Sequence, residues 1–232
     1  MGSSMGARIV TVVRRPPRSL VDEFAGIPSS NIGDMMNRMY NMRSDIKSYT
    51  RNLRLLGTAI TVNAPEGDNL LFHRAIDLAE PGDVIVVNGN GSMSRALCGE
   101  MMYTYAKSRG LAGFVVDGCI RDSDALDTLD FPVYGVGVTP QGPWKFGPGE
   151  INVPIACAGV VVFPGDILVG DSDGIVVIRP SQAEEILALS KQKFRDEAAK
   201  LANYRKGIFD FEVHRHEFAR YAEKSGVVTV EQ

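Results

Sequence analysis

Apolar runs alternate with amphipathic segments through the middle of the chain, and this pattern predicts an α/β fold. The apolar runs have the length of strands and cover residues 57–63, 84–87, 113–120 and 133–138. Helical spacing occurs between them, over residues 69–79 and in the segment that ends before Gly110. A glycine at that position is a common helix stop. Strands joined by helices in this way indicate a parallel sheet.

Turn signals frame this central part. Two Pro-Gly-Asp turns precede apolar runs, and Asp173-Gly174 predicts a hairpin between residues 167–169 and 175–178. Near the N-terminus we expect an extended segment and two short helices that begin at polar caps. These are residues 8–14, a helix to about Ala25 with Ser19 and Asp22 as a capping box, and a helix from Pro28–Asn31 to about Tyr40.

A helical arm is expected at the C-terminal end. A capping-box pattern at Ser181–Glu184 predicts a long helix to about Arg205, and a second helix follows over residues 210–224. We therefore divide the chain into an α/β domain over residues 1–180 and an arm over residues 181–232. Charged and apolar residues alternate along the long helix. This pattern fits packing on its own domain and docking on a neighbouring subunit equally well.

Composition narrows the class of protein. With 44% hydrophobic residues, 232 residues can bury a substantial core. The net charge of −3 gives no global signature of nucleic-acid or anionic-membrane binding, and no segment reaches the roughly 18 apolar residues of a membrane span. Three cysteines without CxxC spacing predict neither a disulfide framework nor a structural zinc site. We expect a cytoplasmic protein with reduced thiols.

The apolar run 113–120 carries the clearest chemical signal, because it ends on Arg121-Asp122. Open α/β sheets bind ligands at the carboxyl ends of their strands. An arginine there can grip a carboxylate with two hydrogen bonds, and an aspartate can hold a hard divalent cation. Glu100 lies in the first turns of the preceding predicted helix, so it can face the same cavity as Asp122. Glu100 could instead be an ordinary surface residue at a helix N-terminus, and Asp122 an ordinary turn residue.

Other motifs are weaker. The glycine-rich loop 88–92 follows a strand, but Ser94 stands where a dinucleotide fingerprint needs its third glycine. Its backbone N–H groups would still suit a small anion. Residues 171–174 read as a hairpin turn, because the rest of a calcium-loop spacing is absent. The three histidines predict no metal pair; they are His73, His214 and His216.

Several segments resemble the class II aldolases of 4-hydroxy-4-methyl-2-oxoglutarate and 4-carboxy-4-hydroxy-2-oxoadipate, whose fold is shared by the regulator of ribonuclease activity A. The similarity runs from about Asn31 to Arg205. The acid that precedes the Arg-Asp pair is its most specific mark, since Glu100 stands 21 residues before Arg121. The matching segments are Gly67–Leu70, Pro81–Val87, Arg95–Glu100, Asp117–Asp122 and Gly147–Pro154.

The resemblance implies a fold and an activity. The expected fold is a three-layer ββα swivelling domain, RraA-like, with a C-terminal helical arm. It is expected to assemble as a trimer or hexamer with sites between subunits. The implied activity is divalent-metal-dependent cleavage of 4-hydroxy-2-oxo acids to pyruvate, with oxaloacetate decarboxylation beside it, as in aromatic-compound degradation. Mg²⁺ is the expected cation, with Mn²⁺ or Co²⁺ as alternatives.

Metal-binding roles carry over residue by residue. Asp122 is implied as the direct metal ligand, and Glu100 as the holder of a metal-bound water. An acid from a neighbouring subunit's arm is also implied. Glu197 matches best, with Asp196 or Glu212 as alternatives.

Substrate-binding roles carry over as well. Arg121 is implied to bind the pyruvyl group, and Asn69 to position the substrate. The turn with Gly99 is implied to meet the substrate carboxylate through the backbone amides of Met101 and Met102. Two departures leave the substrate open. Ser92 replaces an aspartate found in many relatives, and Glu100 replaces an acid that is often aspartate.

The two implied reactions can share one site because they pass through the same intermediate. Breaking the C3–C4 bond of a 4-hydroxy-2-oxo acid leaves the enolate of pyruvate, and decarboxylation of oxaloacetate leaves the same enolate. Fixed positive charge from Arg121 and a divalent cation would stabilise it in both reactions. A Schiff-base route would need a desolvated lysine, and neither Lys107 nor Lys145 is an obvious candidate. Two alternatives stay open: a non-catalytic ribonuclease regulator that binds other proteins, and an S-adenosylmethionine-dependent methyltransferase.

Overall fold

The computed structural model describes residues 4–51, 54–228 and 230. The described chain forms two compact units, which divide between Lys191 and Gln192. This division falls within a helix, because the buried residues of α5 (Ala183–Arg205) all lie in its first turns, from Ala183 to Ser190. The first unit therefore reaches past the expected boundary at residue 180. We describe each unit by itself.

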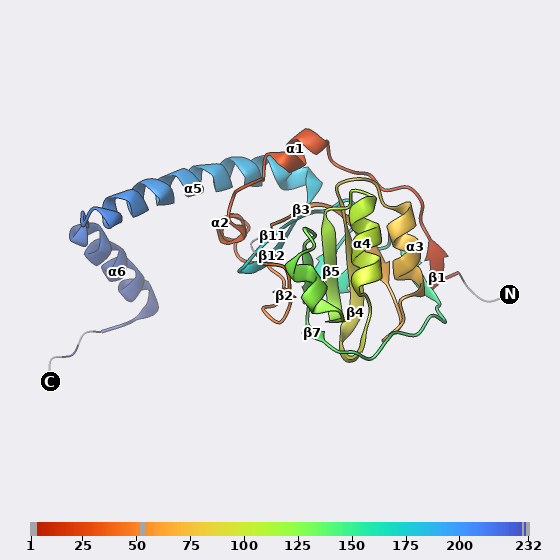
Figure 1. The fold of residues 1–232 in the computed structure, drawn as a ribbon. Coiled ribbons are helices and arrows are strands. Elements are labelled where there is room, and N and C mark those ends of the chain that lie inside the picture. Colours follow the sequence, from red (N-terminus) through yellow and green to blue (C-terminus); the bar gives the residue numbers. More distant parts are fainter. Residues whose placement is uncertain (1–3, 52–53, 229, 231–232) are drawn as a thin grey trace. The chain divides into compact units, whose positions relative to one another are not determined.

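A mixed sheet organises the first unit (Figure 1). Its centre is parallel and consists of β3 (Leu55–Asn63), β4 (Asp83–Ala96), β5 (Gly113–Ile120) and β6 (Val133–Gly135). The strands β11 (Ile167–Asp171) and β12 (Gly174–Ile178) form the expected antiparallel hairpin, and β11 pairs with β3. The other strands of the sheet are β1 (Ala7–Ile9), β2 (Lys47–Ser48), β7 (Gly137–Val138) and β8 (Gly149–Ile151).

Three layers result, as predicted. Helices α3 (Leu70–Leu78) and α4 (Glu100–Ser108) cover one face of the parallel strands (Figure 1). The small antiparallel pair β9 (Ile155–Cys157) and β10 (Val160–Val162) packs on the other face. Strands buried on both faces explain the continuous apolar runs in the sequence. The ββα fold class is thus confirmed.

Aromatic packing holds the helical layer on the sheet. Phe114 on β5 makes edge-to-face contacts with Phe72 and Phe131, with ring centroids 4.8 and 5.0 Å apart. All three side chains are fully buried. Burial of a side chain of this size stabilises the fold by roughly 1.5–3 kcal/mol. This cluster fixes α3 against β5, and Tyr103 of α4 packs on the same Phe114 ring, with centroids 6.1 Å apart. Both helices are thereby held against β5 at the sheet edge where they begin.

A separate core joins the N-terminal helices to the hairpin. It packs α1 (Arg18–Asp22), α2 (Ser29–Met35) and the start of α5 against β11 and β12. The buried Asp171 carboxylate accepts hydrogen bonds from the Ser29 N–H and hydroxyl, at 2.8 and 2.6 Å. A buried carboxylate needs such donors to offset its lost hydration.

The predicted helix starts were wrong in detail. Helix α1 begins after Pro17, and Ser19 makes no capping bond. Helix α2 begins after Pro28 and ends at Met35 rather than near Tyr40. Proline at the boundary sets the start of both helices, and Ser29 directs its hydroxyl to Asp171 instead of a cap. A short 3₁₀ turn, η2 (Pro180–Gln182), likewise replaces the expected cap before α5.

The glycine-rich segment was also wrongly predicted. It is not a loop, because β4 continues to Ala96 and pairs with β5 through two irregularities between Asn88 and Ala96. Asn90 and Gly91 adopt left-handed backbone conformations there, which bend the strand. Helix α4 consequently starts only at Glu100.

The second unit contains the rest of α5 and the helix α6 (Phe211–Ser225). The Asp210 side chain caps α6 by accepting the Val213 N–H at 3.0 Å. Both helices agree with the predicted arm. Many of its apolar side chains are exposed, among them Leu201, Ile208, Phe209, Phe211 and Phe218. In the part of the chain that the structure describes, no helix combines the length and apolar character needed to cross a bilayer.

Candidate functional site

The Arg121-Asp122 pair lies at the carboxyl edge of the parallel strands, directly after β5. The backbone here is firmly held. Arg121 N–H donates to the Cys98 carbonyl at 3.0 Å, and the Tyr103 hydroxyl donates to the Arg121 carbonyl at 2.8 Å. Burial raises the pKa of Tyr103 far above its usual range, so its hydroxyl keeps the proton that it donates. The same cause raises the pKa of the buried Cys98 thiol to about 12.

Asp122 turns its carboxylate back toward the start of α4. Its backbone is in the left-handed region, with φ of 53°, a conformation that aspartate tolerates better than most residues. Oδ2 accepts the Glu100 N–H at 3.1 Å and lies 3.4 Å from Arg121 Nε. The structure thus brings Arg121, Asp122 and Glu100 together, with Glu100 as the first residue of α4.

Gly99 permits this close approach. A Cβ at this position would lie 2.4 Å from Asp122 Oδ2 and 2.9 Å from Arg121 Nε. Its φ of −160° is ordinary extended backbone, so space rather than strain requires the glycine. Gly99 therefore shapes the site through its missing side chain.

The N-terminal amides of α4 are not equivalent. Glu100 N–H donates to Asp122, and Met102 N–H donates to the Gly99 carbonyl at 2.9 Å. Among the described residues, no carbonyl or side chain accepts the Met101 N–H. Of the two amides expected to meet a substrate carboxylate, the Met101 N–H is therefore free and the Met102 N–H is occupied. Their contact with a substrate stays a prediction. A free N–H at a helix N-terminus suits an anion.

Asn69 adds a buried polar group beside this turn. Its Nδ2 donates to the Leu97 carbonyl at 2.8 Å, which connects the start of α3 to the end of β4. Its Oδ1 is buried and makes no hydrogen bond with the described residues. A buried acceptor without a donor costs about 1–3 kcal/mol, so a donor from a bound molecule would be favourable here.

Asp68 organises the loop that runs past the site, a role that sequence reasoning missed. Its buried carboxylate accepts the N–H groups of Leu70, at 2.9 Å, Gly147, at 3.0 Å, and Phe146. Phe146 lies 78 positions further along the chain, in a loop without periodicity, so no local signal marks these contacts.

The acidic groups of the site fit a divalent cation of the magnesium type. Asp122 Oδ1 makes no hydrogen bond or ion pair with the described residues, and the Glu100 side chain is exposed beside it. Mg²⁺ is commonly held by one or two carboxylates and keeps several waters. Within residues 4–51, 54–228 and 230, no three His, Cys, Asp or Glu side chains converge as a metal group. The first unit thus offers two carboxylates, those of Asp122 and Glu100, to a divalent cation.

The acids expected from a neighbouring arm all lie in the second unit. Glu197 pairs with Lys193 at 2.7 Å, and Glu212 pairs with Arg215 at 2.6 Å. Asp196 accepts a hydrogen bond from Gln192 at 2.8 Å. Their assignment to a site stays a prediction.

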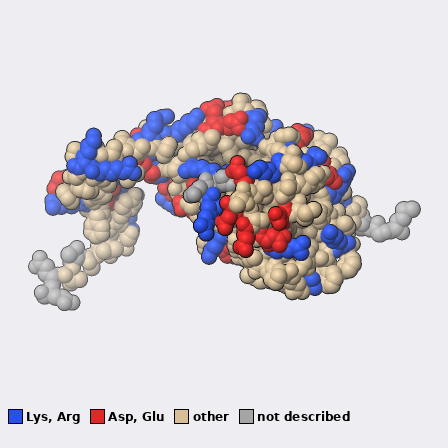
Figure 2. Space-filling view, in the orientation of Figure 1, with Lys and Arg blue, Asp and Glu red and all other residues tan. Residues whose placement is uncertain are grey.

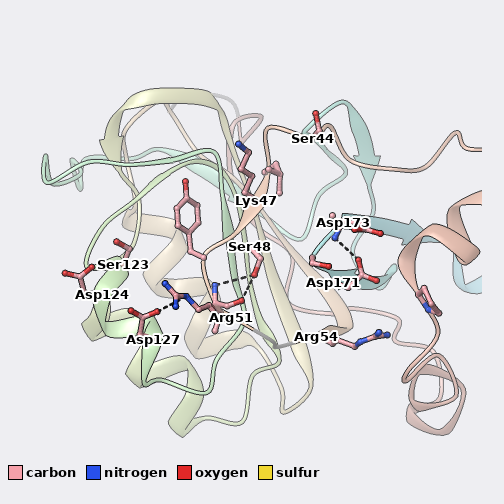
Figure 3. A pocket seen from close by; sticks show the side chains of 16 residues that line it. Ser44, Lys47, Ser48, Arg51, Arg54, Ser123, Asp124, Asp127, Asp171 and Asp173 are labelled. Carbon is pink, nitrogen blue, oxygen red and sulfur yellow. Dashed lines mark hydrogen bonds and ion pairs between the residues drawn. The ribbon is translucent and has the colours of Figure 1, made fainter. Parts of the chain in front are cut away.

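A polar cavity of about 1090 Å³ begins just past Asp122 (Figure 3). One wall is the 3₁₀ helix η1 (Ser123–Asp127), and Asp127 there points toward Arg51, with which it pairs at 3.7 Å. Asp171 and Asp173 lie on the opposite side. The cavity does not include Arg121, Asp122 or Glu100. Acidic and basic side chains are also interspersed over the face of the first unit in Figure 2.

The chain is similar to proteins of one family. A model of the RraA-like family, described as Aldolase/RraA, matches residues 29–177. A Halalkalibacterium halodurans protein, provisionally named 4-hydroxy-4-methyl-2-oxoglutarate aldolase, is 43% identical over 180 residues, which are 78% of this chain and 86% of that protein.

Two solved structures share the fold. One is described as an unusual member of the RNase ES inhibitor RraA protein family from Streptomyces coelicolor. It is 29% identical, with a TM-score of 0.70 over 80% of this chain and 98% of the other. The second is described as an S-adenosylmethionine:2-dimethylmenaquinone methyltransferase from Geobacillus kaustophilus. It is 32% identical, with a TM-score of 0.61 over 65% of this chain and 94% of the other.

Proposed function

The chain belongs to the RraA-like family of aldolases and RraA proteins, and we propose that it is a divalent-metal-dependent lyase that releases pyruvate from 4-hydroxy-2-oxo acids. Oxaloacetate decarboxylation is proposed as its second reaction. The observation that carries the proposal is the meeting of Arg121, Asp122 and Glu100 at the N-terminus of α4. These residues place a guanidinium, a free carboxylate oxygen and a second carboxylate on one sheet edge.

Substrate binding follows from the donors and acceptors of this edge. Arg121 offers a two-pronged contact to the pyruvyl end, and the free Met101 N–H offers a third hydrogen bond to its carboxylate. Asn69 Oδ1 is an acceptor in need of a donor, which a water held between it and the substrate would supply. The three groups together orient the C3–C4 bond.

Asp122 Oδ1 is the proposed cation ligand, with Glu100 as a second carboxylate acting through water. When bound, a divalent cation would supply Lewis-acid polarisation of the C2 keto group. Arg121 contributes charge of the same sign that is fixed in place before the reaction, so it needs no reorganisation as the enolate forms.

The cleavage balances as a retro-aldol reaction. Glu100 accepts the C4 hydroxyl proton through one water, and the C4–O bond becomes a carbonyl. The electron pair of the C3–C4 bond forms the C2–C3 double bond while the C2 carbonyl pair moves onto its oxygen, which gives the pyruvate enolate beside Arg121. The same proton, returned to C3, gives pyruvate. Oxaloacetate reaches the same enolate when its C3–C4 bond breaks and carbon dioxide leaves.

A single unit leaves this edge open to water. The side chains of Arg121 and Asp122 are 44% and 45% exposed. Exclusion of water strengthens the electrostatic interactions that stabilise the enolate. The site is therefore incomplete until another part of the protein shields it from water. We propose a trimer or hexamer in which the arm of a neighbouring subunit covers the edge and brings Glu197, or else Asp196 or Glu212, toward Asp122.

Pyruvate release tests the proposal. Purified protein is incubated with 4-hydroxy-4-methyl-2-oxoglutarate or with oxaloacetate, in Mg²⁺ and in EDTA, and pyruvate is followed with lactate dehydrogenase. The proposal expects Mg²⁺-dependent release from both substrates. Full activity in EDTA, or no pyruvate from either substrate, contradicts it.

Similarity to the Streptomyces protein, described as belonging to an RNase ES inhibitor family, favours one other function, a ribonuclease regulator. Such a regulator binds a protein surface and has no need of Asp122. Capture of a ribonuclease by protein that releases no pyruvate would support the regulator. The methyltransferase activity named for the Geobacillus protein is tested by calorimetric titration with S-adenosylmethionine, for which we expect no heat of binding.

A further inference from the structure

We propose that Arg95 binds the distal carboxylate of the substrate and makes the enzyme selective for dicarboxylic oxo acids. This inference rests on the proposed function for the class of substrate. It concerns the end of the molecule that Arg121 and the α4 amides leave uncontacted. Four observations around Arg95 carry it.

Arg95 lies over an aromatic side chain. Its Cζ lies 4.0 Å from the centroid of the Trp144 ring, and Trp144 stacks in turn on Phe146, with centroids 5.3 Å apart and planes at 19°. A guanidinium that lies over an indole ring gains a cation–π attraction and loses freedom to move. The stack therefore orients Arg95 before a ligand arrives.

The loop that carries Trp144 is itself anchored. Trp144 N–H donates to the Gly67 carbonyl at 2.7 Å, and its carbonyl accepts the Asn69 N–H at 3.0 Å. Asp68 accepts two further loop amides, at Phe146 and Gly147. The platform under Arg95 is thus tied to the same turn, Gly67–Asn69, that delivers Asn69 to the site.

Arg95 and Arg121 flank one glycine. Arg95 Nη1 donates to the Gly142 carbonyl at 2.7 Å, and Arg121 Nη1 lies 3.4 Å from where a Gly142 Cβ would be. The two guanidiniums therefore lie beside the same residue. Two cations placed in this way suit an acid that carries a carboxylate at each end of a short chain.

No carboxylate of the described residues pairs with Arg95. Gln141, with its amide oriented to satisfy both neighbours, accepts from Arg95 Nη2 at 3.1 Å and donates to the Ser94 carbonyl at 3.0 Å. The adjacent acid, Glu66, instead accepts hydrogen bonds from Ser92 and Ser94, at 2.7 and 3.3 Å. A guanidinium has five N–H donors, and only two are used here, so a carboxylate can still be bound.

The chemistry of the ligand follows. A 4-hydroxy-2-oxo acid with a carboxylate on C4 places one carboxylate at Arg121 and the other at Arg95. The corresponding monoacid reaches only Arg121. Charge-assisted contacts of this kind change affinity by roughly 10- to 100-fold. Arg95 is thus a residue that determines specificity, while Arg121 serves both kinds of substrate.

A matched pair of inert oxo acids tests this. Calorimetry in Mg²⁺ measures the Kd of 2-oxoglutarate and of 2-oxopentanoate, which differ by the distal carboxylate. Trp144 is the single tryptophan of the chain, so its fluorescence reports binding beside Arg95. We expect wild-type protein to bind 2-oxoglutarate roughly 10- to 100-fold more tightly, with a fluorescence change that 2-oxopentanoate does not produce.

Substitutions of Arg95 test whether this residue causes the preference for 2-oxoglutarate. Arg95→Met is expected to abolish the preference by weakening 2-oxoglutarate alone, and Arg95→Lys to keep part of it. Arg18→Met is the charge-matched control, because Arg18 contacts Gly82 before the start of β4, at the opposite edge of the sheet. Melting temperatures identify any variant that fails to fold, and Arg95→Lys then carries the test.

Equal binding of the two acids by wild-type protein overturns the inference, and so does an equal loss of both with Arg95→Met. Pyruvate release separates this failure from failure of the proposed function. If wild-type protein releases pyruvate but Arg95→Met retains the full preference for 2-oxoglutarate, only the role of Arg95 is refuted. If wild-type protein neither binds an oxo acid nor releases pyruvate, the role of Arg95 and the proposed function are both refuted.

Discussion

The Glu100 N–H donates to Asp122 Oδ2 at 3.1 Å, so the first residue of α4 fixes the carboxylate that follows β5. This bond occupies one oxygen of Asp122 and leaves Oδ1 for another ligand. It also brings the exposed Glu100 side chain to the same edge. The two residues lie 22 positions apart, and the contact exists because a helix begins where its neighbouring strand ends.

Gly99→Ala is expected to lower pyruvate release about 100-fold or more while the protein stays folded. The added Cβ would lie 2.4 Å from Asp122 Oδ2, and the carboxylate is the part that can shift. Displacement of the Asp122 carboxylate misplaces the proposed cation ligand. Steady-state kinetics and a thermal melt measure the two effects. An unchanged kcat in this variant would show that the Asp122 carboxylate accommodates the added Cβ without losing its function, and would contradict the prediction.

Tyr103→Phe removes the hydroxyl that donates to the Arg121 carbonyl at 2.8 Å. We expect a loss of about 1–3 kcal/mol in the free energy of unfolding, because a partly buried carbonyl loses its donor. The rate should fall as well, since Arg121 loses one of the two hydrogen bonds that hold its backbone. Urea denaturation measures the stability. A change in kcat with no change in stability would point to a direct contact of Tyr103 with substrate instead.

Asp68→Asn is expected to free the loop that carries Trp144. The buried carboxylate accepts three backbone N–H groups, and an amide can accept with only one of its two ends. Trp144 fluorescence should shift toward that of an exposed indole, and the preference for dicarboxylic oxo acids should weaken with it. An unaltered emission spectrum would mean that other contacts suffice to hold the loop.

His73 should make stability depend on pH. Burial lowers the pKa of His73, the positive charge of Lys145 lowers it further, and Asp77 opposes this in part. The unfolded chain then takes up the proton at a higher pH than the native protein. Stability is accordingly full above the usual pKa of about 6.5 and is lost as pH falls from there toward the lowered value. Melting temperatures across this range, compared between wild type and His73→Gln, measure the contribution. An identical pH slope in both proteins would exclude it.

The central strands and the edge that holds Arg121 and Asp122 were predictable from sequence. Continuous apolar runs identify the strands buried on both faces, and in a parallel sheet their carboxyl ends share one edge. That rule was enough to expect Glu100 near Asp122. The hairpin at Asp173-Gly174 and the two helices of the arm were likewise readable from local turn and cap chemistry.

Other features depend on contacts between distant segments. The glycine-rich residues 88–92 read as a loop, yet pairing with β5 keeps them in a bulged strand and delays the start of α4. The stack of Arg95 on Trp144 joins β4 to a loop without periodicity, so no local pattern marks it. The cap predictions failed where proline set the helix start and where Ser29 bonded Asp171 instead.

The most direct test of the account uses Asp122→Asn. Asparagine tolerates the left-handed backbone and can still accept the Glu100 N–H, but it removes the charge that would hold a divalent cation. We predict that wild-type protein releases pyruvate from 4-hydroxy-4-methyl-2-oxoglutarate and from oxaloacetate in Mg²⁺ and not in EDTA. The variant should fold equally well and lose about 100-fold or more of both activities. Full activity of folded Asp122→Asn protein would contradict the account.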